Sequence, residues 1–474
     1  MTGASTIAVA AAVAISALSP DRTVAAQQRP PNIVVIVTDD MGYADVGFHG
    51  STDIVTPNID ALAAGGVRFT DAYVSGPYCS PTRAGLLTGR YPQRFGHEFQ
   101  IGTMETGHGD EVGLPLSERT LADRLKAAGY VTGIVGKWHL GAARQFRPES
   151  RGFDEFFGFL GGAHSYMPSQ VEADLVYDRN NPIFARGAIV SEPDYLTDVF
   201  AAQAVDFIQR HKSRPFFLYL AFSAPHIPMQ VTEKYKQRFL HIADEQRRTY
   251  AAMVSAMDDG IGRTMTALRQ ANLDENTLVF FLNDNGGAAT TGGVNGSNNA
   301  PLRGSKRQTW EGGIRVPFVI RWKSHLPEGT TDQRPIIQLD VFPTALGAAG
   351  VTVHPEWRLD GVNLLPFLTG AASGLPHETL YWRLGGIMAI RRGDWKLVKM
   401  TEGAEWLDPA TLADLSGAAL FNLKSDIRET NDLAATRAEK VRELAEAWQQ
   451  WNAEMARPAW PPPRRPGERR VGYP

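Results

Sequence analysis

Asn32-Ile-Val-Val-Ile-Val37 is a continuous apolar run, rich in β-branched residues, near the start of a 474-residue chain. A strand covered by helices on both faces has this composition, whereas a half-exposed strand alternates apolar and polar residues. Three similar runs follow, and a segment with helical periodicity precedes each of them: Leu116–Ala128 before Tyr130–Val135, Val199–His211 before Pro215–Phe222, and Arg247–Ala271 before Thr277–Leu282. This alternation predicts an α/β fold with a mostly parallel sheet flanked by helices.

The pattern changes at about Leu375. Short apolar segments separated by turn residues follow, and then a helical pattern: Leu380–Leu384, Met388–Arg391, Trp395–Lys399 and the helix Arg437–Met455. We therefore expect a large α/β domain over residues 31–370 and a smaller C-terminal α+β subdomain with an antiparallel sheet over residues 375–457. The tail, residues 458–474, is rich in proline and arginine, a composition typical of poorly ordered chain.

The N-terminus predicts export. Ile7–Leu18 is a short apolar run rich in alanine, and Val24-Ala25-Ala26 supplies the small residues at which a signal peptidase cuts. We therefore expect a signal peptide over residues 1–26 and a periplasmic or secreted protein. The run is too short to span a bilayer, so we expect no integral membrane segment in the mature protein. A disordered, alanine-rich leader is the alternative, because no lysine or arginine precedes the apolar run.

The net charge shows that the protein is not basic overall. Its 48 lysines and arginines and 51 aspartates and glutamates give a formal net charge of −3 at pH 7. Without a basic field, nucleic acid is not expected as a partner, and any anion must be bound by local lysines and arginines.

Polar side chains follow directly after each predicted strand. Asp39-Asp40 comes after the first, Lys137 and His139 after the second, His226 after the third, and Asp284-Asn285 after the fourth. Because the carboxyl ends of parallel strands meet at one edge of a sheet, we expect these side chains to converge there.

Two of these strand ends predict a metal site. Asp39, Asp40, Asp284 and Asn285 offer only oxygen ligands, which suit calcium or magnesium rather than zinc. A lone Asp-Asp pair more often caps a turn, but two acidic strand ends at the same edge would repel one another without a cation. Asp258-Asp259 is the contrast, because it lies inside a helical pattern; we interpret that pair as solvated or capping.

Cys79 is the only cysteine, so an intramolecular disulfide is impossible. Pro81 suits the first turn of a helix and places Cys79 near a helix N-terminus, where free backbone N–H groups favour an anion. Arg83 lies one turn along the same face. The default interpretation is a buried small hydrophobe; chemistry alone favours an activated thiol nucleophile beside an oxyanion.

Cys79-Ser-Pro-Thr-Arg83, followed by Leu87-Thr-Gly-Arg90, resembles the signature of type I (formylglycine-dependent) sulfatases, a family of the alkaline-phosphatase-like superfamily. The similarity runs from about Asn32 to about Ala434 and includes Arg303-Gly-Ser-Lys306 ahead of Glu311-Gly-Gly-Ile-Arg315. The resemblance implies a sulfuric ester hydrolase whose catalytic domain is the region 31–370.

The resemblance also implies the composition of the active site. Cys79 would be oxidised to formylglycine by a formylglycine-generating enzyme, and one Ca²⁺ ion would be bound, with Mg²⁺ as the alternative. The implied metal ligands are Asp39, Asp40, Cys79, Asp284 and Asn285. The implied catalytic residues are Cys79, Arg83, Lys137, His139, His226 and Lys306.

Export and the resemblance together predict a sulfate monoester of a carbohydrate or glycosaminoglycan fragment as the substrate. The candidate specificity loops are Phe95–Gly113, Gly161–Asp178 and Ala288–Arg303, in which Tyr166, Tyr177 and Asn295 would suit a sugar. Two alternatives remain: hydrolysis of phosphodiester or phosphonate esters on the same fold, and an inactive, carbohydrate-binding relative. The histidines without such context receive no role: His97, His108 and His164.

Overall fold

A computed structural model describes residues 1–4, 6, 29–101, 112–168, 181–191, 194–290 and 294–460. Almost all of the predicted signal peptide and of the tail lies outside the described residues, as do His108 and Tyr177. Among the described residues, no helix is both long and apolar enough to cross a membrane.

A ten-stranded sheet forms the centre of the larger domain, in the order β11-β2-β10-β9-β1-β8-β4-β5-β6-β7. Its middle is parallel: β1 (Asn32–Thr38) lies between β9 (Thr277–Asn283) and β8 (Phe216–Ala221), with Val35 opposite Phe280 on one side and Tyr219 on the other. The parallel strands β4 and β5 continue the sheet, and β10 and the β6–β7 hairpin join it antiparallel. The remaining strand bounds are β2 (Val67–Phe69), β4 (Val131–Lys137), β5 (Glu155–Phe159), β6 (Ile183–Ala185), β7 (Ala188–Val190), β10 (Phe318–Arg321) and β11 (Thr330–Asp332).

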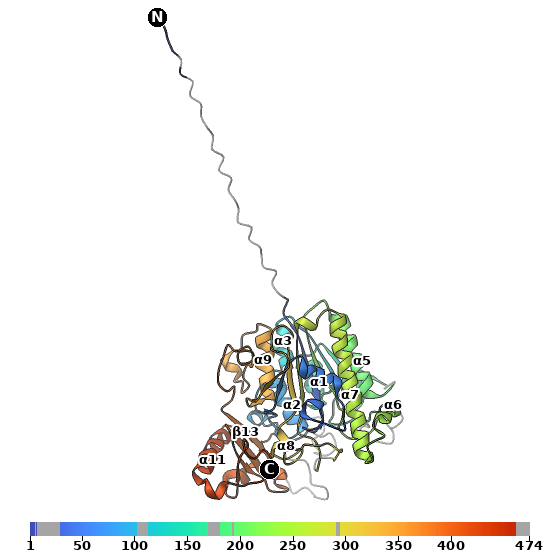
Figure 1. Ribbon diagram of the computed structural model, residues 1–474, viewed down its shortest axis with the longest axis vertical. Helices are drawn as coiled ribbons and strands as arrows, with labels where there is room; N and C mark the ends of the chain where they lie inside the picture. The colour runs from blue at the N-terminus through green and yellow to red at the C-terminus, as the bar shows by residue number, and fades with distance from the viewer. Residues whose placement is uncertain are drawn as a thin grey trace.

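Helices cover both faces of this sheet because successive β1 side chains point to opposite sides. Val34 and Ile36 belong to the core shared with α1 (Pro57–Ala64), α5 (Leu196–His211) and α7 (Glu245–Gln270). Ile33, Val35 and Val37 pack with the opposite layer, which contains α2 (Cys79–Thr88), α3 (Leu121–Ala127) and α9 (Val341–Ala348). Figure 1 shows α5 and α7 on one side of the sheet and α3 and α9 on the other. The predicted α/β fold is confirmed.

One detail differs from the sequence prediction, and another decides between two interpretations. Helix α3 begins at Leu121 rather than at Leu116, because Thr120 and Asp123 cap it reciprocally, each side chain accepting the other residue's N–H. Of the two interpretations of Asp258-Asp259, solvated or capping, the structure supports capping for Asp258, which is buried. It accepts the N–H groups of Asn58 and Ile59 at 3.1 and 2.8 Å and so caps the first turn of α1.

The C-terminal subdomain contains an antiparallel four-stranded sheet, as predicted: β13 (Thr379–Leu384), β14 (Ile387–Arg392), β15 (Trp395–Lys399) and β16 (Ala419–Asn422). Helix α11 (Ala438–Ala453) packs on it through Leu444, Trp448 and Trp451. Figure 1 shows α11 and β13 together at one end of the molecule. Short elements complete the fold: β3 (Ala72–Tyr73) paired with β12 (Ile336–Ile337), α6 (Glu233–Lys236), α8 (Glu311–Ile314) and α10 (Leu365–Leu368).

Candidate active site

The four predicted strand ends meet at one edge of the sheet. Asp39 follows β1, and its N–H donates to the carbonyl of Ala224 beyond β8 at 3.2 Å. Asp284 follows β9, and its N–H donates to the carbonyl of Thr38 at 3.1 Å. These bonds extend the parallel ladder past the ends of the strands, so the polar side chains are held by the sheet itself.

Helix α2 begins at Cys79 and brings the cysteine to this edge. The start of the helix confirms the position predicted from Pro81. Cys79 is fully buried, and its Sγ lies 3.5 Å from Oδ1 of Asp39. One potential ligand atom from each of Asp39, Asp40, Cys79 and His226 lies within 4.8 Å of the others, so the structure contains a buried cluster suited to a metal ion.

Arg83 links two of the carboxylates. Its Nε and Nη2 donate to Oδ2 of Asp284 at 3.1 and 2.9 Å, and Nη2 lies 3.3 Å from Oδ2 of Asp39. Its Nη1 donates to the carbonyl of Lys137 at 3.2 Å. All of these side chains are fully buried. The guanidinium therefore compensates part of the negative charge and fixes the helix against two strand ends.

Two lysines neutralise the Asp39-Asp40 pair. Lys137 Nζ donates to Oδ2 of Asp39 at 2.5 Å, and Lys306 Nζ donates to Oδ2 of Asp40 at 2.7 Å. Asn285 donates its amide N–H to Oδ1 of Asp40 at 2.7 Å. The structure thus brings residues predicted from separate motifs into one cluster.

The hydrogen bonds of the two histidines define their tautomers. His226 Nδ1 lies 2.6 Å from the carbonyl of Ile227, which can only accept, so Nδ1 carries a proton and Nε2 faces Asp40 Oδ2 at 3.4 Å. His139 Nε2 lies 2.9 Å from the carbonyl of Ile101, so Nε2 carries the proton there. His139 Nδ1 is buried and makes no hydrogen bond within the described part of the chain, which leaves a basic nitrogen available.

Burial and neighbouring charges shift the pKa values of the two histidines and of Asp39. Burial, followed by the charge of Lys306, lowers the pKa of His226 to about 4. Burial, followed by Lys137, lowers the pKa of His139 well below its usual value. Burial alone would raise the pKa of Asp39, but Lys137, His226 and Arg83 hold it well below its usual range. Neutral histidines and an ionised Asp39 are the expected resting state.

Cys79 behaves differently from an activated thiol. Burial raises the pKa of the Cys79 thiol, and the charges of Asp284 and Asp39 raise it further. A thiolate is therefore disfavoured at neutral pH, and the unmodified side chain is a poor nucleophile in this setting.

The residues fit a divalent cation. Asn285 Oδ1 is buried and has no hydrogen-bond partner among the described residues, although its amide nitrogen is bound to Asp40. The N–H of Asp40 lies 3.4 Å from Oδ1 of Asp284, and Arg83 bridges the carboxylates of Asp284 and Asp39, so these buried oxygens belong to one cluster. An unpartnered buried oxygen in a cluster with three carboxylates is the chemistry that a hard cation satisfies.

Two residues predicted to suit a sugar are buried supports instead. Tyr166 is fully buried, and its hydroxyl contacts the carbonyls of Ser223 and His226 at 2.6 and 3.0 Å. Asn295 is fully buried, and its amide donates to the carbonyls of Asp40 and Pro225 at 3.1 Å each. The polar groups of both side chains are hydrogen-bonded to backbone carbonyls and hold the loop that carries His226.

The sequence analysis also missed supporting residues around Cys79. His97 Nε2 lies 2.6 Å from the hydroxyl of Ser80, and that hydroxyl donates to the carbonyl of His139 at 2.9 Å. Asn283 Oδ1 accepts from the hydroxyl of Thr38 at 2.8 Å and fixes the end of β1. The one available signal was the position of Ser80 and Asn283 next to predicted site residues in the chain; His97 had no such neighbour.

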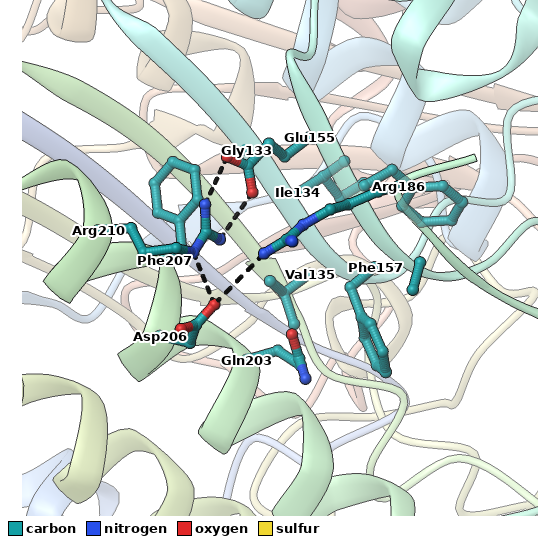
Figure 2. Close-up of a pocket in the computed structure, with 12 residues that line it drawn as sticks. Gly133, Ile134, Val135, Glu155, Phe157, Arg186, Gln203, Asp206, Phe207 and Arg210 are labelled. Atoms are coloured by element: carbon teal, nitrogen blue, oxygen red, sulfur yellow. Dashed lines mark hydrogen bonds and ion pairs between the residues drawn. The ribbon is translucent and has the colours of Figure 1, made fainter. Parts of the chain in front are cut away.

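A separate pocket of about 430 Å³ lies between β4, β5 and α5 and contains none of the predicted site residues. Figure 2 shows its charged side chains turned toward one another: Arg210 donates to both carboxylate oxygens of Glu155 at 2.6 and 2.7 Å and to Asp206 at 2.7 Å. These charges are mutually neutralised, so the pocket does not compete with the Cys79 cluster as the candidate active site.

Comparison with known proteins identifies the family. The sulfatase family model matches residues 31–351. Human N-acetylgalactosamine-6-sulfatase is 34% identical over 417 residues, which cover 84% of this chain and 78% of that protein. Human arylsulfatase A is 34% identical over 455 residues, which cover 89% and 87%. The crystal structure of Ps i-CgsB in complex with k-i-k-neocarrahexaose superimposes with a TM-score of 0.83 at 37% identity, covering 91% of this chain and 95% of that one.

The family model spans more than half of the chain, and both human relatives exceed 30% identity across most of it. The protein therefore belongs to the sulfatase family and is a sulfuric ester hydrolase.

Proposed function

We propose that this sulfatase hydrolyses sulfate monoesters of carbohydrates or glycosaminoglycan fragments, with Cys79 converted to formylglycine as the nucleophile. The observation that carries the proposal is the position of Cys79 at the start of α2, inside one buried cluster with Asp39, Asp40 and His226. The names of the relatives, which include a galactosamine sulfatase and a structure holding a neocarrahexaose, support a saccharide substrate.

The cations of the site suit a sulfate ester. Hydrolysis builds negative charge on the attacking, leaving and peripheral oxygens, so preorganised positive charge stabilises the transition state. Lys137 and Lys306 would bind the peripheral sulfate oxygens, and Arg83 would hold the hydrated formylglycine. Their burial against Asp39, Asp40 and Asp284 fixes them before the substrate arrives.

The proposed reaction uses both hydroxyls of the formylglycine hydrate. One hydroxyl gives its proton to a carboxylate of the cluster and attacks sulfur in line, and the bond from sulfur to the ester oxygen breaks. The departing alcohol takes a proton from Nε2 of His226, helped by Lys306; Nε2 would be protonated for this step once the anionic ester is bound. His139 then takes the proton from the second hydroxyl, the bond from carbon to the sulfate oxygen breaks, and the aldehyde returns. The basic Nδ1 of His139 supports this role. A serine ester has no second hydroxyl on the same carbon and could not collapse in this way.

Asp39, Asp40, Asp284, Asn285 and the oxidised Cys79 would hold a single divalent cation, Ca²⁺ or alternatively Mg²⁺. When bound, it supplies Lewis acidity and neutralises the carboxylates. Calcium is the proposed ion, because a set of oxygen ligands drawn from several loops tolerates its flexible coordination.

Maturation and export complete the proposal. Because Cys79 is fully buried, a formylglycine-generating enzyme would have to act before the chain folds around it. The N-terminal 26 residues would direct export to the periplasm or outside the cell, where sulfated glycans are found.

The test combines mass spectrometry with turnover. Protein co-expressed with a formylglycine-generating enzyme should show a loss of about 18 Da at residue 79, the change expected when the thiol becomes an aldehyde. It should release sulfate from 4-nitrophenyl sulfate and faster from sulfated saccharides, whereas Cys79→Ala should be inactive on both. Equal turnover by the two proteins would refute the mechanism, and faster turnover of phosphonate or phosphodiester substrates would favour the alternative hydrolase.

A further inference from the structure

Arg307 directly follows the candidate catalytic lysine and lies against two aromatic rings. Its guanidinium carbon is 5.3 Å from the ring centroid of Tyr78 and 5.2 Å from that of Trp406. Its Nε donates to the hydroxyl of Tyr78 at 2.9 Å. The half-buried side chain is therefore held in one place by contacts on two sides.

Tyr78 connects Arg307 to the reaction centre. It is the residue before Cys79, and the Nζ of Lys306 lies 5.5 Å from the centroid of the same ring. The N–H of Arg307 donates to the carbonyl of Pro77 at 2.8 Å, and its backbone adopts a φ of 72°. A left-handed conformation is unfavourable for arginine and persists only where surrounding contacts enforce it. The chain thus turns Lys306 and Arg307 toward one aromatic ring.

Arg307 differs from the other cations of the site in its partners. Arg83, Lys137 and Lys306 each contact a buried aspartate. Arg307 makes no ion pair with a carboxylate within the described ranges, and its single side-chain hydrogen bond uses Nε. The two terminal nitrogens of its fork therefore remain available to a ligand.

The second ring comes from the C-terminal subdomain. Trp406 ends a short 3-10 helix, Ala404–Trp406, whose Ala404 belongs to a small core with Phe99 and Ile101. The carbonyl of Ile101 contacts His139 at 2.9 Å. The subdomain therefore packs against the segment that contacts His139 and supplies one wall beside Arg307.

We infer that Arg307, held by Tyr78 and Trp406, forms a subsite for a second anionic group of the saccharide, beside the sulfate that is hydrolysed. A guanidinium fork matches the paired oxygens of a sulfate or carboxylate, and the rings fix its plane. This inference rests on the proposed function and narrows its substrate class to saccharides with at least two anionic groups.

The test compares matched substrates. Wild-type protein carrying formylglycine should favour the more anionic member of each pair: D-glucosamine-2-N,6-O-disulfate over D-glucosamine 6-sulfate, neocarra-oligosaccharides with two sulfates per disaccharide over those with one, and a sulfated disaccharide containing a uronic acid over its neutral analogue. The glucosamine and neocarra-oligosaccharide pairs test a sulfate and the uronic acid pair tests a carboxylate. For each pair, the preference is the kcat/KM of the more anionic substrate divided by that of the less anionic one. Arg307→Ala should reduce this preference about tenfold by raising the KM of the more anionic substrate. Arg307→Lys and Trp406→Ala should reduce it less.

The matched control is Arg124→Ala. Arg124 is also half-buried over a tryptophan, with its guanidinium carbon 3.7 Å from the ring of Trp357, but it lies on α3, which leads into the opposite, amino end of β4. It should keep the wild-type ratio.

Three outcomes would overturn the inference in distinguishable ways. Equal losses on both members of every pair, carried by kcat, would show that Arg307 acts only by positioning Lys306. An unchanged ratio in Arg307→Ala would remove the subsite while leaving the proposed function intact. A wild-type protein that hydrolyses 4-nitrophenyl sulfate but no saccharide would refute the proposed substrate class together with the subsite.

Discussion

Lys396 Nζ lies 2.8 Å from Oε1 of Glu311, and both side chains are fully buried between the two parts of the molecule. Lys396 belongs to β15 of the C-terminal sheet, and Glu311 begins α8 in the larger domain. Glu429 completes the cluster: its Oε1 lies 2.9 Å from Lys396, and its Oε2 accepts the N–H of Glu311 at 2.8 Å. The pair joins the subdomain to a segment that supports the site.

Helix α8 contacts both halves of the active site. The N–H of Gly286, directly after Asn285, donates to the carbonyl of Gly313 at 2.9 Å. The N–H of Gly312 donates to the carbonyl of Arg303 at 2.7 Å, in the loop that leads to Lys306. A shift of α8 would therefore move Asn285, a proposed metal ligand, and Lys306, the proposed catalytic lysine, together.

We expect Lys396→Ala to lower the free energy of unfolding by about 3–5 kcal/mol, because it removes the buried cation that Glu311 and Glu429 share, and Glu311 keeps only its contact with Arg315 as an ion pair among the described residues. kcat should fall with stability, since α8 loses its anchor. Thermal unfolding and steady-state kinetics measure both effects, and Lys424→Ala, at an exposed lysine of the same subdomain, should change neither. A Lys396→Ala protein as stable as wild type would show that the cluster contributes nothing to the interface.

Tyr166 offers a test of how His226 is positioned. Tyr166→Phe keeps the buried ring but removes the hydroxyl that contacts the carbonyls of Ser223 and His226. We expect kcat to fall about tenfold with little change in KM, because a misplaced general acid affects the transition state more than binding. Tyr130→Phe is the matched control, since that hydroxyl contacts the carbonyl of Pro31 at the other end of the sheet. Equal effects of the two substitutions would contradict this prediction.

The oxygen ligands predict a dependence on a divalent cation. Chelation by EDTA should abolish turnover and lower the melting temperature, because removal of an ion present at 100 times its Kd costs about 3 kcal/mol. Re-addition of Ca²⁺ should restore both, and Mg²⁺ should restore them less well. Asn285→Ala should raise the Ca²⁺ concentration needed, whereas Asn276→Ala, at the amino end of β9, should not. Full activity in EDTA would exclude the metal site.

A histidine at the start of the C-terminal subdomain, His377, predicts how stability depends on pH. Burial alone would lower the pKa of His377, but Asp340, at 2.7 Å, and Asp360 raise it above the usual value. A pKa higher in the folded than in the unfolded chain gives stabilisation that is complete below about pH 6.5 and is lost as pH rises through the folded pKa.

We therefore expect the wild-type melting temperature to fall between pH 6 and pH 8.5 by more than that of His377→Asn. His354→Asn, at an exposed histidine, should behave as wild type. Parallel pH profiles for wild type and His377→Asn would contradict the assignment of this effect to His377.

Local pattern was enough to predict the fold class and the convergence of polar side chains at one edge of the sheet. The unbroken apolar run Asn32–Val37 can be buried only between two helical layers, and the rule that ligands gather at the carboxyl ends of strands predicted where Asp39, Lys137, His226 and Asp284 meet. The spacing of apolar residues predicts the fold class because it depends on which faces of a helix or strand are buried.

Tertiary structure alone decided which polar residues face the site and which support it. Tyr166 and Asn295 look like sugar ligands in the sequence, yet both are fully buried and hold the His226 loop, while Arg307 and Trp406, distant in sequence, meet at one ring. Long-range packing determines whether a tyrosine hydroxyl or a guanidinium is already bound to the protein. The local sequence cannot predict such a contact, because the group that binds the hydroxyl or the guanidinium comes from another helix, strand or loop.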